Sequence, residues 1–518
     1  MRTRARSSTS SANFRIMLQW IQHCNKHHTC RVAKSDASEC LPARLLKIGQ
    51  DLDSQIRLIN TNDTKLQAPY ATLSYCWGSG LPVKLTSSSL SAFERSIWVA
   101  ALPKTLRDAV IVARQIGVNY LWIDALCIIQ DSSDDWEKEA RKMAEIYSRS
   151  YCNIAATHTR SCDDGLFTIN DYGKSAVICV DTRWDGVDIY RLGLVDYEFV
   201  IKKLERAPLN SRGWVLQERF LSPRTIHFGD DQVLWECYGG YKCEAFPFGP
   251  IFGMATDFAK RRLSNQPECT RPYSNTDEAY ALWGHLVGKF CSCKLTFPRD
   301  KLIAISGLAR KFQSAMNDEY IAGLWWNQLP AQLAWTGEKT IKPLQYRAPS
   351  WSWASLEGMI SIHRLQADIL GLINPIEYNI EYATEDKYGE VTSGSIRVSG
   401  KLFPHILTPY QDGFIWQMIF YDEDLNSGPY ARPAVMDISS DYSNVEYYCL
   451  PVLLEKSCPA HVVNCLILQA TENAQGEYSR IGRFSTHYKE DVDIMTERSE
   501  SYEMDPDLYD AHSTITII

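Results

Sequence analysis

Three features that would assign a function class at once are missing from this sequence. No apolar run in its 518 residues approaches the roughly 18 residues of a membrane-spanning helix, so we expect no membrane span. Positive charge is not in excess, because 54 Lys and Arg face 62 Asp and Glu for a net charge of −8. That balance gives no electrostatic reason to expect a nucleic-acid partner. We find no internal repeat, which argues against a repeat architecture.

The composition is that of a soluble globular protein, with 45% hydrophobic and 22% charged residues. A chain of 518 residues is too long for one ordinary core, so two or three domains are expected. Its 16 cysteines are scattered, and several fall in strand-like runs, such as Cys127, Cys152 and Cys179. This usage favours reduced, buried thiols in a cytoplasmic protein over a disulfide framework.

The N-terminal region, residues 1–48, contains an arginine-rich tail and a short Cys/His segment. The first 20 residues carry four arginines and no acid, which fits a transit peptide or a disordered tail. The lack of an amphipathic stripe favours the tail. Cys24, His27, His28, Cys30 and then Cys40 follow, and these are zinc-ligand types. Their spacing matches no standard zinc finger, so we favour a docked segment with free thiols; a metal site stays open.

The stretch from Tyr120 to Thr157 has the pattern of a βαβ unit. YLWIDALCII is apolar enough for a strand buried on both faces, and Asp124 is its one ionisable residue. Asp134, followed by Glu137, predicts a helix start, and apolar residues then recur at helical spacing. We expect Glu139 to be solvated or paired with Lys142 or Arg141. Residues 151–157 then form a second strand.

Residues 71–117 add a strand and a helix before this unit. YATLSYCWGSG reads as a strand that ends in a Gly/Ser loop, and LPKTLRDAVIVARQIGV reads as an amphipathic helix. Right-handed crossovers would make the strands parallel, and ligand sites in such sheets lie beyond the carboxyl ends of the strands. That rule places these candidates at one edge: Cys76, Trp77, Gly78, Ser79, Asp124, Gln130 and Asp131. The loop lacks the lysine of a P-loop.

The remaining domain boundaries follow from changes in pattern. Residues 49–240 are predicted to form the α/β domain, and within it Ser211 could cap a short helix that carries Trp214 and Glu218 on one face. Two helical patterns suggest a helical extension over 241–345. Alternating apolar runs predict a β-rich C-terminal region over 346–518, in which Trp351 and Trp353 pack in the core.

Three blocks together resemble the fungal heterokaryon-incompatibility (HET) domain family. They are YATLSYCWGSG, the long run from LPKTLRDAV to CNIAAT, and SRGWVLQERFLSPRTIHF. The resemblance is specific over roughly residues 70–237, looser to residue 358, and slight beyond. It implies a role in fungal non-self recognition and regulated cell death, with partners among other proteins of that pathway or in a homo-oligomer.

A fainter resemblance links the same order of elements to Toll/interleukin-receptor (TIR) domains, and so to a mainly parallel, flavodoxin-like sheet. Some TIR domains cleave the nicotinamide–ribose bond of NAD with a glutamate on a comparable short helix. The resemblance implies Glu218 as the catalytic carboxylate and Trp214 as its aromatic neighbour. NAD would then be a substrate, and no bound cofactor or metal is expected in catalysis.

Each candidate also has a structural interpretation. Glu218 could pair with Arg212, Arg219 or Arg224. Asp124 could cap the turn after it, and Gln130 and Asp131 could organise that turn. A Cys/His hydrolase built on Cys76 or Cys127 is disfavoured, because an apolar setting raises a thiol pKa. A non-enzymatic adaptor that assembles through homotypic or partner contacts is the alternative function.

Overall fold

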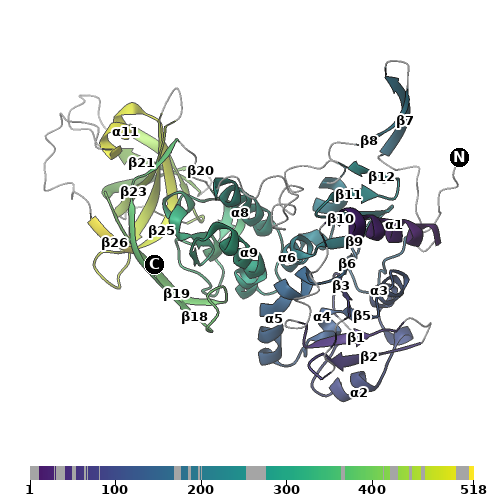
Figure 1. Cartoon of the computed structure of the whole chain (residues 1–518). Coiled ribbons are helices and arrows are strands. Elements are labelled where there is room, and N and C mark those ends of the chain that lie inside the picture. The colour runs from purple at the N-terminus through teal and green to yellow at the C-terminus, as the bar shows by residue number, and fades with distance from the viewer. Residues whose placement is uncertain are drawn as a thin grey trace. The chain divides into compact units, whose positions relative to one another are not determined.

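The computed structural model divides the chain into two compact units, Met1–Pro272 and Tyr273–Ile518. Each unit is described by itself (Figure 1). The residues described are 11–28, 30, 41–49, 54–63, 66, 68–80, 82–168, 177–184, 188–195, 199, 201–251, 276–362, 368–411, 414–420, 430–440, 442, 446–456, 461–496 and 513–518. No helix among them is both long and apolar enough to cross a membrane.

A ten-stranded sheet organises the N-terminal unit, in the order β12-β11-β10-β9-β6-β3-β5-β1-β2-β4. Its centre is parallel and consists of β5 (Tyr120–Trp122), β3 (Tyr70–Ser74), β6 (Cys152–Ala155) and β9 (Arg224–Phe228). In chain order these four strands lie 2-1-3-4, which is the flavodoxin-like arrangement. The strand order therefore reverses between β3 and β6, where such sheets bind ligands.

Antiparallel hairpins extend both sides of this centre. On one side lie β1 (Arg44–Lys47), β2 (Gln55–Asn60) and β4 (Ile97–Trp98); on the other lie β10 (Val233–Cys237), β11 (Gly240–Cys243) and β12 (Phe246–Ile251). The prediction of a mainly parallel sheet is thus wrong for the sheet as a whole. Short connections explain the antiparallel pairing of β1 with β2 and of β9 through β12, because they return a strand antiparallel to its neighbour. The antiparallel pairs β1–β5 and β2–β4 join strands that are far apart in the chain.

Helices cover both faces of the sheet. α1 (Ser11–His27) and α3 (Lys104–Gln115) lie on one side, and α5 (Ser133–Ser148) and α6 (Gly213–Leu221) on the other (Figure 1). Right-handed crossovers require α3 and α5 to lie on opposite faces. The connection from β3 to β5, which contains α3, and the connection from β5 to β6, which contains α5, cross the sheet in opposite directions. Gly117 follows α3 with φ +80°, as expected for a glycine at a helix end. α2 (Leu90–Arg95) and the β7–β8 hairpin (Val177–Trp184, Asp188–Val195) complete the unit.

Two local predictions in this unit are wrong. The strand expected over 120–129 stops at Trp122, and Asp124–Cys127 form the short helix α4. Helix α5 begins after Ser132, whose hydroxyl accepts from the Asp135 N–H at 3.3 Å, so Ser132 and not Asp134 is the cap. Of the two alternatives expected for Glu139, the structure shows the pair with Lys142, whose Nζ lies 3.6 Å from the carboxylate, and Glu139 is buried.

The helix that carries Glu218 also starts differently from the prediction. Ser211 ends a short 3-10 turn over Leu209–Ser211, and Arg212 is the residue before α6. No side chain caps α6, so the first backbone N–H groups of this helix need hydrogen-bond partners other than the side chain of Arg212.

The C-terminal unit combines a few helices with a β-barrel. α8 (Thr276–Cys291), α9 (Ser306–Met316) and α10 (Leu329–Leu333) precede it, with the short strands β13 (Tyr320–Ile321), β14 (Leu324–Trp325), β15 (Thr336–Ile341) and β16 (Glu357–Ser361). Trp283 of α8 packs edge-on against Phe312, Tyr320 and Trp325. Trp351 and Trp353 are fully buried, in agreement with the expectation of core packing.

Six strands of the second ten-stranded sheet close into a ring, β23-β20-β21-β22-β25-β24 and back to β23. Their bounds are Phe403–Gln411 (β20), Ile415–Phe420 (β21), Tyr430–Met436 (β22), Glu446–Glu455 (β23), Val462–Ala470 (β24) and Glu477–Thr486 (β25). Around them lie β17 (Ile369–Gly371), β18 (Asn374–Tyr382), β19 (Val391–Gly400), β26 (Ser513–Ile517) and α11 (Lys489–Thr496). The barrel has its own apolar core, which includes Trp416, Met418 and Phe484.

Candidate functional site

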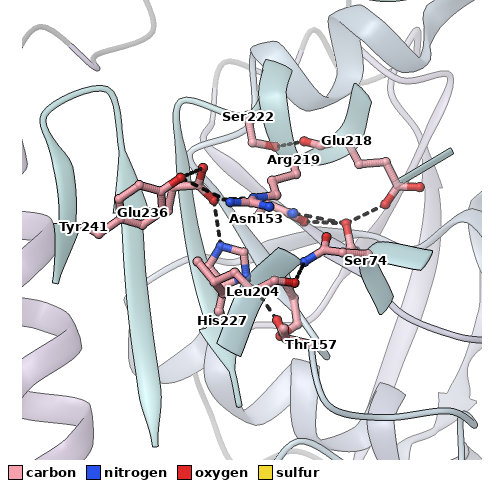
Figure 2. A network of polar contacts seen from close by, with 12 residues as sticks. Ser74, Asn153, Thr157, Leu204, Glu218, Arg219, Ser222, His227, Glu236 and Tyr241 are labelled. Carbon is pink, nitrogen blue, oxygen red and sulfur yellow. Dashed lines mark hydrogen bonds and ion pairs between the residues drawn. The ribbon is translucent and has the colours of Figure 1, made fainter. Parts of the chain in front are cut away.

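Glu218 lies at the point where the strand order of the sheet reverses. It projects from α6 toward Ser74, the last residue of β3, and the Ser74 hydroxyl donates to Glu218 Oε2 at 2.5 Å (Figure 2). The Asn153 side chain on β6 donates to the same hydroxyl at 3.0 Å. The carboxylate is therefore bonded to Ser74 of β3, and Asn153 of β6 holds that hydroxyl; these are the two strands that flank the reversal.

Burial determines the charge state of this carboxyl. Only 6% of Glu218 is exposed, and burial raises the pKa of the carboxyl from its ordinary 4.5 to about 7. The positive charge of Arg212 and the hydrogen bond from Ser74 oppose that rise, while the nearby Asp124 carboxyl adds to it. A carboxyl tuned to neutral pH by burial and neighbouring charges is typical of functional sites.

Asp124 completes a pair of acidic groups at this edge. It follows β5, and its carboxylate accepts from the Ala125 N–H at 2.7 Å and from Trp77 Nε1 at 2.9 Å. Burial raises the pKa of Asp124 above its ordinary value, and the Arg212 charge lowers it. Asp124 does cap the turn after it, and it also orients Trp77, which leaves the end of β3.

Arg212 provides positive charge that lowers the pKa of both carboxyls. Its Nη1 donates to the carbonyl oxygen of Tyr75, the residue after β3. No ion pair joins Glu218 to any residue that the structure describes, since Arg219 pairs with Glu205 and Glu236 instead. The structural interpretation of Glu218 as a salt-bridge partner therefore fails for Arg219.

Arg224, the third candidate partner of Glu218, is also occupied elsewhere. Its guanidinium donates to Cys24, Asn25 and the carbonyl of Tyr151. Trp214 lies one helical turn before Glu218 on α6 and is partly buried. Its ring packs edge-on against Trp136 of α5, with 6.2 Å between the ring centres.

Comparison with known protein families gives a match that includes Ser74, Asp124 and Glu218. The family model described as Heterokaryon incompatibility protein (HET) matches residues 70–218. The match begins at Tyr70, the first residue of β3, and ends at Glu218 itself. Residues 70–218 belong to the heterokaryon incompatibility family. No curated protein and no solved structure matches the chain.

The matched segment thus contains both Glu218 and its hydrogen-bond partner Ser74. The other candidates at this edge differ in accessibility. Cys76 is 8% exposed and burial raises its thiol pKa, while Cys127 is fully buried and burial raises its pKa to about 12. Neither is an activated thiolate, which disfavours a cysteine nucleophile. Gly78, with φ +78°, and Ser79 form an exposed turn.

Gln130 and Asp131 organise the loop after α4. The Gln130 side chain donates to the carbonyl oxygens of Asp124 and Ile128 at 3.1 and 3.0 Å. Asp131 is exposed and accepts from the backbone N–H and hydroxyl of Ser87, and these contacts lower its pKa. Gln130 is therefore linked to the backbone of Asp124, whereas Asp131 faces the segment that carries Ser87.

A second polar network lies in the N-terminal unit, and it was not predicted from the sequence. His227 on β9 contacts the Thr157 hydroxyl at 3.0 Å through Nδ1 and Glu236 on β10 at 2.8 Å through Nε2 (Figure 2). The order hydroxyl, imidazole and carboxylate is that of a nucleophile, base and orienting acid. All three residues are at most 1% exposed, so substrate cannot reach the hydroxyl. No local pattern in the sequence pairs these three residues, since every residue of β9 and β10 is buried and Thr157 follows β6.

Arg219 extends this second network. Its guanidinium lies 2.9 Å from Glu236 Oε2 and 3.0 Å from Glu205 Oε1, and it donates to the Tyr241 hydroxyl at 3.1 Å. The two networks start from adjacent residues of α6. Glu218 contacts Ser74 of β3, and Arg219 contacts Glu236 of β10. Arg219 therefore holds α6 against β10, and α6 also carries the candidate catalytic residue Glu218.

One further group of residues has the chemistry of metal ligands. Of the residues singled out in the sequence, Cys24, His28 and Cys30 come together, and Cys237 from β10 joins them. His27 is not part of the group, and Cys40 lies outside the described residues.

A pocket of about 980 Å³ opens in the C-terminal unit. Arg347 and Arg480 line it, but both guanidiniums are occupied, with Arg347 bound to Glu357 and Arg480 to Asp437. The pocket therefore presents no unpaired arginine for an anion, and its chemistry does not favour a particular ligand.

Proposed function

We propose that this protein is a cytoplasmic effector of fungal non-self recognition and regulated cell death, and that its HET domain hydrolyses the N-glycosidic bond of NAD or a related nucleotide. The observation that carries the proposal is the position of Glu218. A buried carboxyl with a pKa of about 7 lies where the strand order reverses in the parallel centre of the sheet, within the electrostatic influence of Asp124 and Arg212.

The chemistry requires little more than one placed carboxylate. When the bond breaks, nicotinamide leaves with the bonding electron pair and becomes neutral, and the ribose acquires oxocarbenium character. The ionised Glu218, held by Ser74, would accept hydrogen bonds from the ribose hydroxyls and stabilise that positive charge. Water then adds to the ribose carbon and loses a proton to solvent, which yields ADP-ribose, nicotinamide and one proton.

The neighbouring aromatic and polar groups fit roles in binding. The partly buried Trp77 and Trp214 offer ring faces on which a nicotinamide or adenine could stack. Arg212 supplies a positive charge suited to the pyrophosphate. The exposed turn at Gly78 and Ser79 would contribute backbone N–H groups, and the other contacts to the nucleotide would come from Cys76, Asp124, Gln130 and Asp131.

Nicotinamide release by the full-length protein tests the proposal. The purified chain should convert NAD to nicotinamide and ADP-ribose, followed by chromatography, and Glu218→Gln should lower the rate at least about 100-fold. Glu137→Gln, on the exposed face of α5, is the matched control and should keep the rate. Equal turnover by the Glu218→Gln variant would exclude this carboxylate from the reaction.

Expression in a naive fungus separates the enzyme from an adaptor. For the enzyme, cellular NAD falls before the cells die, and Glu218→Gln prevents both events. For an adaptor that acts through self-association or a pathway partner, cells die with NAD intact, and the Glu218→Gln variant kills as well as the wild type.

A further inference from the structure

Four metal-ligating side chains converge at the junction of α1 and the β10–β11 turn. The Sγ atoms of Cys24, Cys30 and Cys237 and a ring nitrogen of His28 all lie within 4.8 Å of one another. A tetrahedral zinc ion with Zn–S bonds of about 2.3 Å places its sulfurs about 3.8 Å apart, so only small movements separate the observed cluster from a bound site. The three cysteines are free and buried, at most 4% exposed.

The fold brings these ligands together from distant parts of the chain. Cys24 lies in the last turn of α1, and His28 follows the helix with its backbone N–H bonded to the Cys24 carbonyl at 3.0 Å. Cys237 is the last residue of β10 and lies 209 positions away from His28, whose Nδ1 is 3.3 Å from the Cys237 sulfur. Packing of Trp20 against Trp235, with ring centres 6.3 Å apart, holds α1 on β10.

The surroundings of the cluster suit metal-bound thiolates. Arg224 Nε donates to the Cys24 sulfur at 3.3 Å, and the Gly239 backbone N–H donates to the Cys237 sulfur at 3.3 Å. Hydrogen bonds to ligating sulfur stabilise its negative charge and fix its orientation.

Gly239 also makes room for the histidine ligand. A Cβ at this position would lie 2.1 Å from Cε1 of His28, so only glycine lets the imidazole lie against the turn.

We propose that Cys24, His28, Cys30 and Cys237 bind one zinc ion as a structural Cys₃His site. Three thiolates and an imidazole favour zinc over magnesium or calcium, which prefer oxygen ligands. Four protein ligands leave no open position for water or substrate, so the site is structural rather than catalytic. The zinc ion would join α1 to β10. Because Glu236 of β10 pairs with Arg219 of α6, the site would also support the helix that carries Glu218.

Metal analysis of the full-length protein tests the site. Protein purified under reducing conditions should contain about one zinc ion per chain, and X-ray absorption should give three sulfurs at about 2.3 Å and one nitrogen at about 2.0 Å. Cobalt exchanged into the protein should show the visible bands of a tetrahedral, thiolate-rich site.

Paired variants identify the ligands. His28→Asn and Cys237→Ser should lose the zinc, whereas His27→Asn and Cys243→Ser should keep it. His27 is the sequence neighbour of His28, and Cys243 is a buried thiol on the adjacent strand. If a ligand variant fails to fold, absorption and cobalt spectra of the wild type still decide the matter.

Three results would overturn the proposal. One is wild-type protein that neither contains zinc nor takes up added Zn²⁺. Another is equal metal content in the His27→Asn and His28→Asn variants. The third is a disulfide between two of the three cysteines in protein kept reduced during purification.

Discussion

The charge on Glu218 is the residue-scale property on which the proposed chemistry depends. Its pKa of about 7 means that the carboxyl is neutral in mildly acidic solution and ionises near pH 7. If the ionised form stabilises the transition state, the rate of nicotinamide release should rise with pH and level off above about pH 7.

The free energy of unfolding should fall as pH rises, whereas the rate of nicotinamide release should increase. The folded-state pKa of Glu218 is raised, so its contribution to stability is complete below the unfolded pKa of 4.5 and is lost as pH rises through about 7. Relative to the wild type, Glu218→Gln should therefore gain up to about 3 kcal/mol of unfolding free energy between pH 5 and pH 8. Urea unfolding at both pH values measures this difference.

Glu137→Gln is the control for this comparison, because Glu137 is exposed on α5. It should leave the pH dependence as it is in the wild type. A constant difference between Glu218→Gln and the wild type across this pH range would show that Glu218 is ionised throughout.

At the scale of elements, the buried ion pair between Arg219 and Glu236 ties α6 to β10. Arg219→Met would leave Glu236 and Glu205 without their shared cation, and loss of one partner of a buried pair costs about 3–5 kcal/mol. Arg141→Met removes a pair with Glu137 at 3.7 Å on the surface and should cost less than about 1 kcal/mol. Denaturant unfolding compares the two, and similar losses would contradict the structural role of Arg219.

The start of α5 gives a second prediction at this scale. Ser132→Ala removes the hydroxyl that accepts from the Asp135 N–H and should destabilise the protein by about 1 kcal/mol. Ser133→Ala changes the same residue type one position later, in the first turn, where the side chain is exposed. It should have little effect on the unfolding free energy, and an equal loss in both variants would refute the assignment of the cap.

For the whole molecule, the two units have separate cores, so calorimetry should resolve two unfolding transitions. Arg219→Met should lower one of them. Arg480→Met should lower the other, because Arg480 is fully buried in the C-terminal unit and its guanidinium is bonded to Asp437 at 3.0 and 3.1 Å. A single transition that both variants shift would show that the units unfold together.

Prediction from the sequence succeeded where one local pattern determines the element. The helix over Lys104–Gln115 and the strand at Tyr70–Ser74 follow from apolar period and turn residues. It failed at Asp124–Cys127, where an apolar run forms a short helix rather than a strand. Periodicity cannot distinguish these two states when every residue is buried.

The sequence likewise predicted some contacts of the candidate site and not others. The rule for parallel sheets placed Trp77 and Asp124 at one edge, and a hydrogen bond of 2.9 Å joins them. The pairing of Glu218 with Ser74 joins residues 144 positions apart, and the contact of Cys237 with His28 joins residues 209 apart. No local pattern encodes such contacts.

The sequence by itself determined the resemblance of residues 70–218 to the HET family, through three blocks of residues in a fixed order. It also determined the α/β character of the first unit and the β-rich character of the second, because these depend on side-chain periodicity along short segments. Only the tertiary structure decided that antiparallel hairpins flank the parallel strands, that Glu218 is buried beside Ser74, and that Cys237 completes the ligand group of Cys24, His28 and Cys30. Those outcomes depend on strand order and helix packing, which bring together residues that the chain keeps far apart.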